Sequence, residues 1–264
     1  AQGNSKDKRT IVKKAVHKEA IHDISTFTQQ HNPTVYNPGI AKDEEVIATT
    51  FYDLQSNSCL SNRLAVFSDG TVAATFTLGL EDAAAMTDRG TGYNYYDGTS
   101  WGPQPLVRIE EDRTGWPNIA AFGENGEMVA AHYSGATVTT NKGIVFHKRD
   151  AKGTGDWEYV QLLQSPDPLF PDALWPRMVT TGTDHDIIHV INTTYPTGNG
   201  GGPWQGMDPA LLYSRSDDGG QTWDPESLIL DGITSSEYSE IGGDSYGWAE
   251  PVGETLAFVV CDTW

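Results

Sequence analysis

The chain has 264 residues, of which 38% are hydrophobic and 10% aromatic, so it can bury a sizeable core and is too apolar to be disordered. Its formal net charge is −19. A surface this acidic repels phosphate backbones and anionic lipid, which argues against nucleic acid and membrane surfaces as partners. The sequence holds no apolar run near the ~20 residues that a membrane span needs.

The first segment, residues 1–32, is basic and carries the one convincing helical pattern. Apolar residues recur at helical spacing from about Thr10 to Ile24. Residues 1–30 hold six basic and three acidic residues, which leaves a net charge of −22 on the rest. The start, Ala1-Gln2-Gly3-Asn4, lacks an initiator Met and resembles the end left by signal-peptide cleavage. We therefore expect an exported bacterial protein, secreted or on the cell surface. The role of the segment stays open between linker, strand donor and docking arm.

From residue 33 to residue 264 the pattern changes to short strands. Runs of Val, Ile, Phe, Tyr and Thr alternate with Asp-Gly, Asn-Gly, Gly-Gly and Pro-Gly dipeptides, and no further helix of ordinary length is predicted. We therefore expect an all-β fold. The two cysteines, Cys59 and Cys261, could form one disulfide in an exported protein, and the sequence leaves their pairing open.

This region contains an internal repeat. A strand, a tight polar turn and a second strand recur in the stretches 62–76, 117–133, 176–191 and 249–260. The first three are each followed by a strand and a glycine-bearing turn that ends on a tryptophan, namely Trp101, Trp157 and Trp223. These tryptophans lie 56 and 66 residues apart, so one repeat is about four strands long. That is the size of a β-propeller blade.

One of these turns lies in residues 214–223, which read SRSDDGGQTW. Its acids and glycines would also suit a metal loop, but they are better explained as turn residues. We expect the aspartate to accept backbone N–H groups, the glycines to take positive φ, and the tryptophan to pack between blades. The stretch matches S-x-D-x-G-x-T-W at every specified position and so resembles the Asp-box of BNR-repeat propellers in the sialidase-like superfamily. The resemblance implies a structural role for Ser216, Asp218, Gly220, Thr222 and Trp223.

The same resemblance implies a ring of six or seven blades, whereas four repeats are visible. We expect an incomplete propeller that a C-terminal continuation or a partner chain completes. A small closed ring that uses residues 33–55 is the other option. The stretches FYDLQSNS, DRGTGYNYYDGTSWG and GDSYGWAEP also resemble type IX-exported bacterial surface proteins in style.

Binding residues are expected on the innermost strand of each blade, whose starting end opens on the usual ligand face of a propeller. Alignment of the repeats places four polar residues at one equivalent position: Arg63, Asn118, Arg177 and Glu250. They could bind a carboxylate or sugar hydroxyls, with arginine supplying paired donors. The alternative is that this position is merely solvated at the mouth of the channel.

Comparison with sialidases adds two residues with specific roles. Arg63-Leu64-Ala65 resembles the R-I-P of the first sialidase blade, whose arginine binds the carboxylate of sialic acid, although Ala65 replaces the proline. The resemblance implies Asp88 as a candidate for the catalytic acid. The other arginines and the Tyr–Glu nucleophile pair have no assignable counterparts, and sialidase activity would be lost without that pair.

A metal could use some of Asp184, His185, Asp186 and His189, but a β-turn and a strand explain them as well, so we predict no metal and no cofactor. Our leading interpretation is a binding or assembly module without catalysis, which takes a glycan through the axial pocket or binds a surface protein. One alternative is a sialidase-like glycoside hydrolase whose remaining catalytic residues lie outside this chain. Another is a purely structural repeat unit of a surface assembly. The ligand, the number of blades and the oligomeric state are left open.

Overall fold

In the part of the chain that the structure describes, the strands form four consecutive antiparallel sheets. The computed structural model describes residues 45–55, 62–83, 86–133 and 143–261. The first blade consists of β1 (Leu64–Val66), β2 (Val72–Leu78) and β3 (Gly90–Tyr96). The second consists of β4 (Thr114–Phe122), β5 (Gly126–Tyr133), β6 (Gly143–Arg149) and β7 (Glu158–Leu163). The third consists of β8 (Ala173–Thr181), β9 (Ile187–Thr194) and β10 (Leu211–Ser216), and the fourth of β11 (Tyr246–Trp248) and β12 (Phe258–Val260).

Within each sheet the strands pair in chain order, as in the blades of a β-propeller. In the first and third blades single bridges, Tyr96 with Trp101 and Tyr213 with Leu228, stand where the second blade has its fourth strand. The only helix among the described residues is the 3₁₀ turn Thr197–Asn199. The fold is therefore all-β and built of propeller-type blades, as expected from the repeats. The expected helix near residues 10–24 and Cys59 lie outside the described residues, and Cys261 is exposed.

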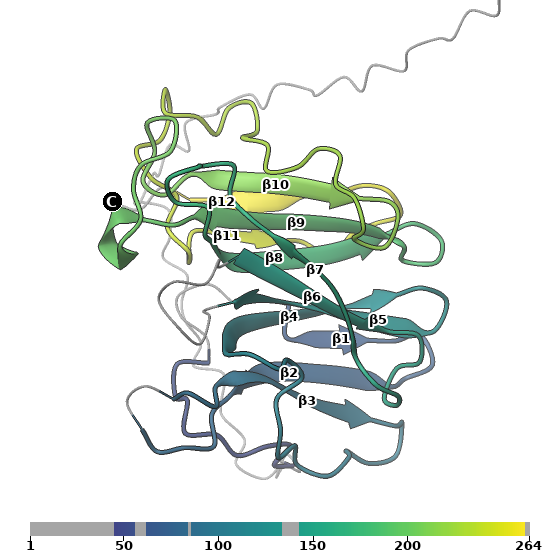
Figure 1. Ribbon diagram of the computed structural model, residues 1–264. Coiled ribbons are helices and arrows are strands. Elements are labelled where there is room, and N and C mark those ends of the chain that lie inside the picture. The colour runs from purple at the N-terminus through teal and green to yellow at the C-terminus, as the bar shows by residue number, and fades with distance from the viewer. Residues whose placement is uncertain (1–44, 56–61, 84–85, 134–142, 262–264) are drawn as a thin grey trace, which may run out of the picture. The chain divides into compact units, whose positions relative to one another are not determined.

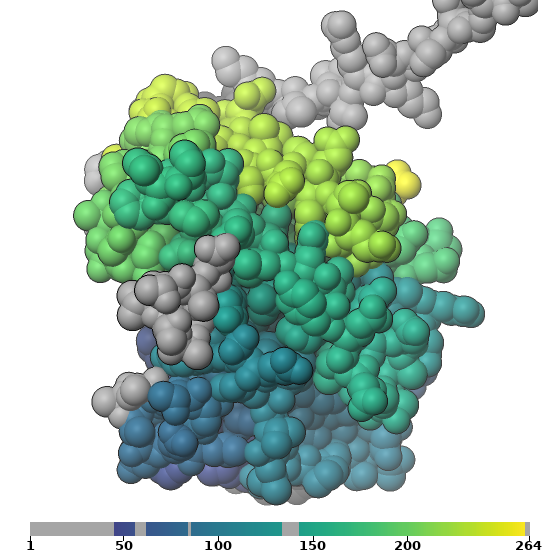
Figure 2. All heavy atoms as spheres, in the orientation of Figure 1, coloured from purple at the N-terminus to yellow at the C-terminus, as the bar shows by residue number. Residues whose placement is uncertain are grey.

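Hydrogen bonds join the first strands of the four blades. The amide of Ile119 in β4 donates to the carbonyl oxygen of Asn62 beside β1 at 2.8 Å. On the other side, the indole Nε1 of Trp248 in β11 donates to the carbonyl oxygen of Arg177 in β8 at 2.9 Å. The second blade thus lies between the first and the third (Figure 1). Figure 2 shows the same order on one face, with the second blade in teal between blue and green atoms.

The hydrophobic core is divided among the interfaces between neighbouring blades. Met128 and Phe146 of the second blade pack with Met178 and Ile188 of the third. Smaller clusters join the first blade to the second around Ile119 and the third to the fourth around Tyr246. β5 is buried along all but its last residue, because a blade in the middle of the stack is covered on both faces. Burial on both faces explains the small and β-branched residues of the repeats.

Candidate functional site

A cavity of about 580 Å³ opens at the starting ends of β4 and β8. This is the end of the inner strands at which ligand binding was expected. Its wall includes the side chains of Tyr52, Arg89, Arg113, Trp116, His132 and Trp175. Aromatic rings with a few polar groups among them are typical of ligand pockets.

The two tryptophans of this wall sit at β-bulges in equivalent strands. Trp116 in the stretch TGWPN (114–118) has φ +55°, and Trp175 in ALWPR (173–177) has φ +51°. The strand register shifts at both places, between Gly115 and Asn118 in β4 and between Leu174 and Arg177 in β8. Positive φ is uncommon for a bulky residue and persists only where the surroundings hold it.

Asn118 and Arg177, two of the four sequence-predicted binding residues, hold these bulges in place. Asn118 is 0% exposed and donates from Nδ2 to the carbonyl oxygens of Pro176 at 2.7 Å and Trp116 at 3.2 Å. Arg177 is 1% exposed and donates from Nη1 to the carbonyl oxygen of Pro176 at 3.0 Å and from Nη2 to that of Gly243 at 2.9 Å. Both side chains therefore support the cavity from beneath and do not belong to its lining.

Arg63 lies close to the same layer. Its Nη2 donates to the carbonyl oxygen of Gln55 at 2.7 Å. Burial, and next the charge of Arg177, lower the pKa of Arg63 to about 10. The structure thus brings Arg63 and Arg177 within electrostatic range of each other, with Asn118 in the strand between them.

The fourth predicted residue, Glu250, is placed elsewhere, and its alignment with the other three is wrong. β11 begins at Tyr246, and its last residue, Trp248, pairs with Phe258. Glu250 therefore lies beyond the paired strand, near the turn that Val252 and Thr255 close. It is exposed and borders a second cavity of about 710 Å³ at the hairpin ends of the inner strands. Glu250 stands two residues before Val252 at its turn, whereas Asn118 and Arg177 stand four residues before Phe122 and Thr181 at theirs. Glu250 is therefore nearer the hairpin end of its strand than they are.

The cavity wall carries two arginines that the repeat alignment did not single out. Arg89 donates from Nε to the carbonyl oxygen of Thr114 at 2.8 Å, and Arg113 from Nε to that of Met86 at 3.1 Å. Burial, and then the neighbouring charge of Arg113, lower the pKa of Arg89 to about 10. Burial also lowers the pKa of Arg113. An anion bound here would offset this repulsion between guanidinium groups.

Tyr52 and His132 also contribute rings to the wall. The guanidinium of Arg89 lies 5.4 Å from the centre of the Tyr52 ring. Burial raises the pKa of Tyr52 even though Arg89, Arg63 and Arg113 all act to lower it. Tyr52 is therefore a neutral phenol that can exchange hydrogen bonds with a ligand. The imidazole of His132 stacks on Trp116, with ring centres 5.6 Å apart and planes 12° apart.

Asp88, the candidate acid, serves a local turn. Its Oδ2 accepts the amide of Glu81 at 3.0 Å and also the amide of Leu80. The side chain does not line the cavity, although Arg89 next to it does. The carboxylate in the cavity wall is that of Asp244, which was not among the predicted site residues.

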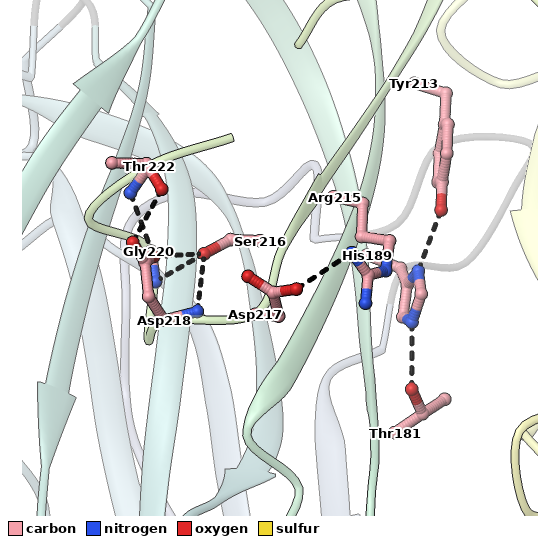
Figure 3. A network of polar contacts seen from close by, with 9 residues as sticks. All are labelled: Thr181, His189, Tyr213, Arg215, Ser216, Asp217, Asp218, Gly220 and Thr222. Carbon is pink, nitrogen blue, oxygen red and sulfur yellow. Dashed lines mark hydrogen bonds and ion pairs between the residues drawn. The ribbon is translucent and has the colours of Figure 1, made fainter. Parts of the chain in front are cut away.

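The turn after β10 is closed by the side chains of Ser216 and Asp218 (Figure 3). Asp218 Oδ1 accepts the amides of Gln221 at 3.0 Å and Thr222 at 2.9 Å, and Ser216 Oγ accepts the amide of Gly220 at 2.8 Å. Hydrogen bonds, first that from the Thr222 hydroxyl, lower the pKa of Asp218 to about 2. Gly220 has φ +87°, and Trp223 packs on Phe146 of the second blade with ring centres 5.1 Å apart. Ser216 ends β10, the other four motif residues lie in or directly after the turn, and none of the five lines either cavity.

The His-Asp stretch in the third blade shows no metal cluster. Among the described residues no group of three or more His, Cys, Asp or Glu side chains is placed to hold a metal ion. His189 instead contacts the Thr181 hydroxyl through Nε2 and the Tyr213 hydroxyl through Nδ1, each at 2.9 Å (Figure 3). Asp184, His185 and Asp186 are exposed turn residues.

Comparisons with known proteins give low similarity throughout. No protein-family model and no curated protein matches the chain. An α-L-arabinofuranosidase from Fusarium graminearum is 15% identical with a TM-score of 0.45, over 74% of this chain and 52% of that one. An α-L-arabinanase from Penicillium chrysogenum is 13% identical with a TM-score of 0.44, over 77% and 63%. A glycosyl hydrolase from Bacteroides ovatus is 11% identical with a TM-score of 0.41, over 66% and 50%.

The chain thus spans about half to two thirds of the length of these structures. At these identities and TM-scores the matches carry no argument about what the chain binds. Within the part of the chain that the structure describes, no helix is long and apolar enough to cross a membrane.

Proposed function

We propose that this chain forms the ligand-binding part of a secreted or cell-surface propeller of the Asp-box type. It binds a glycan that carries a carboxylate, in the cavity at the starting ends of β4 and β8. The observation that carries this proposal is the pair Arg89 and Arg113 in a cavity wall rich in aromatic side chains, in a protein with net charge −19. Guanidinium groups bind carboxylates in paired geometry, and aromatic rings contact the C–H faces of sugars.

A sialidase-like glycoside hydrolase is the second candidate. It is supported by the carboxylate of Asp244 and the phenol of Tyr52 in the same wall as the two arginines. A tyrosine nucleophile needs help to lose its proton, whereas burial raises the pKa of Tyr52. We therefore place binding before catalysis on the residues of this chain. Residues contributed from outside it could complete a hydrolase.

The ring is proposed to be completed by further blades, from the same protein or from a partner chain. Apolar side chains are exposed on both end blades, with Val66 of β1 75% exposed and Val259 of β12 56% exposed. Further blades would bury these side chains. Hydrogen exchange tests this in the native protein isolated from its source. Slower exchange at β1 there than in this chain alone is expected, and equal rates would contradict it.

Isothermal titration and a turnover assay test the proposed function. The probes are 3′-sialyllactose and trigalacturonic acid, with lactose and cellotriose as neutral controls. Acidic probes are expected to bind and neutral ones not, and Arg113→Ala should weaken binding about 10- to 100-fold. Arg215→Ala is the matched control, because Arg215 pairs with Asp217 away from the cavity.

Binding of lactose as tight as that of sialyllactose, or an unchanged affinity in Arg113→Ala, would contradict the proposal. Release of sialic acid or galacturonic acid by the wild type would favour the hydrolase. No binding of any saccharide would favour the structural repeat unit.

A further inference from the structure

The two tryptophans of the cavity wall form a matched pair across neighbouring blades. Trp116 is the third residue of β4 and Trp175 the third residue of β8. Each precedes a proline, each stands at a register shift, and each has positive φ. Both side chains are partly exposed. The same unusual backbone is therefore built twice, once per blade, at the same wall of one cavity.

Core packing does not account for this backbone. Trp157 and Trp223 pack between blades from the outer turns, and neither has positive φ. Residues with strained backbone cluster at ligand sites. There the surrounding structure holds the side chain in a position that an unstrained backbone would not allow. The strain at Trp116 and Trp175 therefore points to a role outside the core.

The surroundings fix both tryptophans from below. Asn118 Nδ2 donates to the carbonyl oxygen of Trp116, and the Tyr246 hydroxyl donates to that of Trp175 at 2.6 Å. Gly243 lies so close to Trp175 that a Cβ there would come within 2.5 Å of indole carbons. The chain therefore uses buried hydrogen bonds and a close glycine contact to keep these rings in place.

The two arginines lie at the Trp116 end of the cavity. Arg113 is in the same segment, three residues before Trp116. The guanidinium of Arg89 lies against Gly115, where a Cβ would be 3.0 Å from Nη2. Around Trp175 lie Gly243, the Tyr246 hydroxyl and Nη1 of Arg177, and the last two groups donate to its carbonyl oxygen from below the lining. The two guanidinium groups of the wall thus lie toward Trp116, whereas its carboxylate, Asp244, directly follows Gly243 beside Trp175.

We infer that Trp116 and Trp175 mark two neighbouring sugar subsites, so that the cavity binds at least two consecutive residues of an acidic oligosaccharide. The acidic sugar lies at Trp116, with its carboxylate on Arg89 and Arg113. The next sugar contacts Trp175. This inference rests on the proposed function and adds the length and direction of the ligand. A cavity of about 580 Å³ has room for more than one sugar ring.

Titration of a length series tests the inference. The probes are galacturonic acid, digalacturonic acid and trigalacturonic acid, and in a second arm N-acetylneuraminic acid and 3′-sialyllactose. Within the arm that binds, the longer saccharide is expected to bind about tenfold tighter than the monosaccharide. Trp175→Ala should remove this tenfold difference and leave the monosaccharide affinity unchanged. Trp116→Ala should weaken binding of the monosaccharide and of the longer saccharide alike. Trp101→Ala, at the outer turn of the first blade, is the matched control and should change neither.

Gly243→Ala is a second variant, in case Trp175→Ala folds poorly. Its added methyl group must displace the indole of Trp175, so it should reduce the gain from the second sugar in the same way. Equal affinities for monosaccharide and disaccharide in the wild type would overturn the inference and leave the proposed function standing. A Trp175→Ala variant that weakens binding of the monosaccharide and of the disaccharide by the same factor would also overturn the inference and leave the proposed function standing. Absence of binding to every acidic probe would overturn the proposed function and this inference with it.

Discussion

Asn118 donates from Nδ2 to the carbonyl oxygen of Pro176 at 2.7 Å, and this bond ties the bulge of β4 to the bulge of β8. The same nitrogen reaches the carbonyl oxygen of Trp116 at 3.2 Å. One buried amide therefore serves the backbone beside both tryptophans of the cavity. The interface between the second and third blades and the shape of the candidate site depend on the same side chain.

Asn118→Ala should lower the free energy of unfolding by about 1–3 kcal/mol, because it removes the buried hydrogen bond to the carbonyl oxygen of Pro176 and the partly buried one to that of Trp116. Urea unfolding measures the change. Asn125→Ala is the matched control, since Asn125 is exposed at the hairpin turn between β4 and β5, and it should stay within about 0.5 kcal/mol of the wild type. Equal stabilities of the two variants would contradict the role given to Asn118.

Arg149→Met, at the interface between the first two blades, should lower the free energy of unfolding more than Asn118→Ala does. Arg149 Nε donates to Glu127 Oε1 at 2.6 Å, and its guanidinium lies 4.3 Å from the ring centres of both Tyr93 and Trp157. Removing the cation leaves the fully buried Glu127 charge uncompensated, which costs about 3–5 kcal/mol. The double variant Arg149→Met, Glu127→Leu should regain part of this loss in urea unfolding. A double variant less stable than Arg149→Met would show that the buried pair is not the cause.

Asp218→Ala should open the turn after β10, because this carboxylate accepts the amides of Gln221 and Thr222. Loss of such a cap costs about 1 kcal/mol in thermal or urea unfolding. Asp217→Ala removes the same charge one residue earlier and should cost less, since Asp217 makes only an exposed pair with Arg215. Saccharide affinity should be unchanged in both variants. Reduced affinity in Asp218→Ala alone would mean that this turn belongs to the binding site.

His189 should make the protein less stable in mild acid. Burial, and then the charge of Arg215, lower its pKa to about 4 in the folded state, against about 6.5 in the unfolded chain. The folded state therefore binds a proton less readily, so this contribution to stability is full above about pH 6.5 and declines as the pH falls toward 4. Thr181, Tyr213 and Arg215 face the ring, and none of them carries a negative charge in this range.

The measurement is the free energy of unfolding between pH 7 and pH 4. His189→Gln should be less stable at pH 7 and lose less stability over this range than the wild type. His185→Gln, at an exposed turn, should follow the wild-type slope. The same slope in all three proteins would refute the role of His189.

The sequence was sufficient to predict the blades. Strand periodicity and glycine-bearing turns are local signals, and they placed the hairpins of residues 62–76, 117–133 and 176–191 where β1–β2, β4–β5 and β8–β9 lie. The outer turns likewise end on Trp101 and Trp157, as the repeat indicated. Each of these features depends on a local stretch of about fifteen residues.

The candidate site was harder to predict, because it depends on contacts between blades. A bulge just before Asn118 and one just before Arg177 shift the strand register, so the aligned polar residues are buried beneath the cavity. Arg89 and Arg113 lie outside the aligned core of the repeat and reach the cavity from the ends of β3 and β4. The repeated Trp-Pro at 116–117 and 175–176 is the one sequence signal that could have located this wall.

The proposed function and the two sugar subsites both depend on where an acidic saccharide binds. A crystal structure of the protein soaked with trigalacturonic acid or 3′-sialyllactose would measure this directly. A carboxylate is expected within hydrogen-bonding distance of Arg89 and Arg113, with a sugar ring in contact with Trp116. A saccharide found instead in the second cavity, beside Glu250 at the hairpin ends of the inner strands, would contradict it.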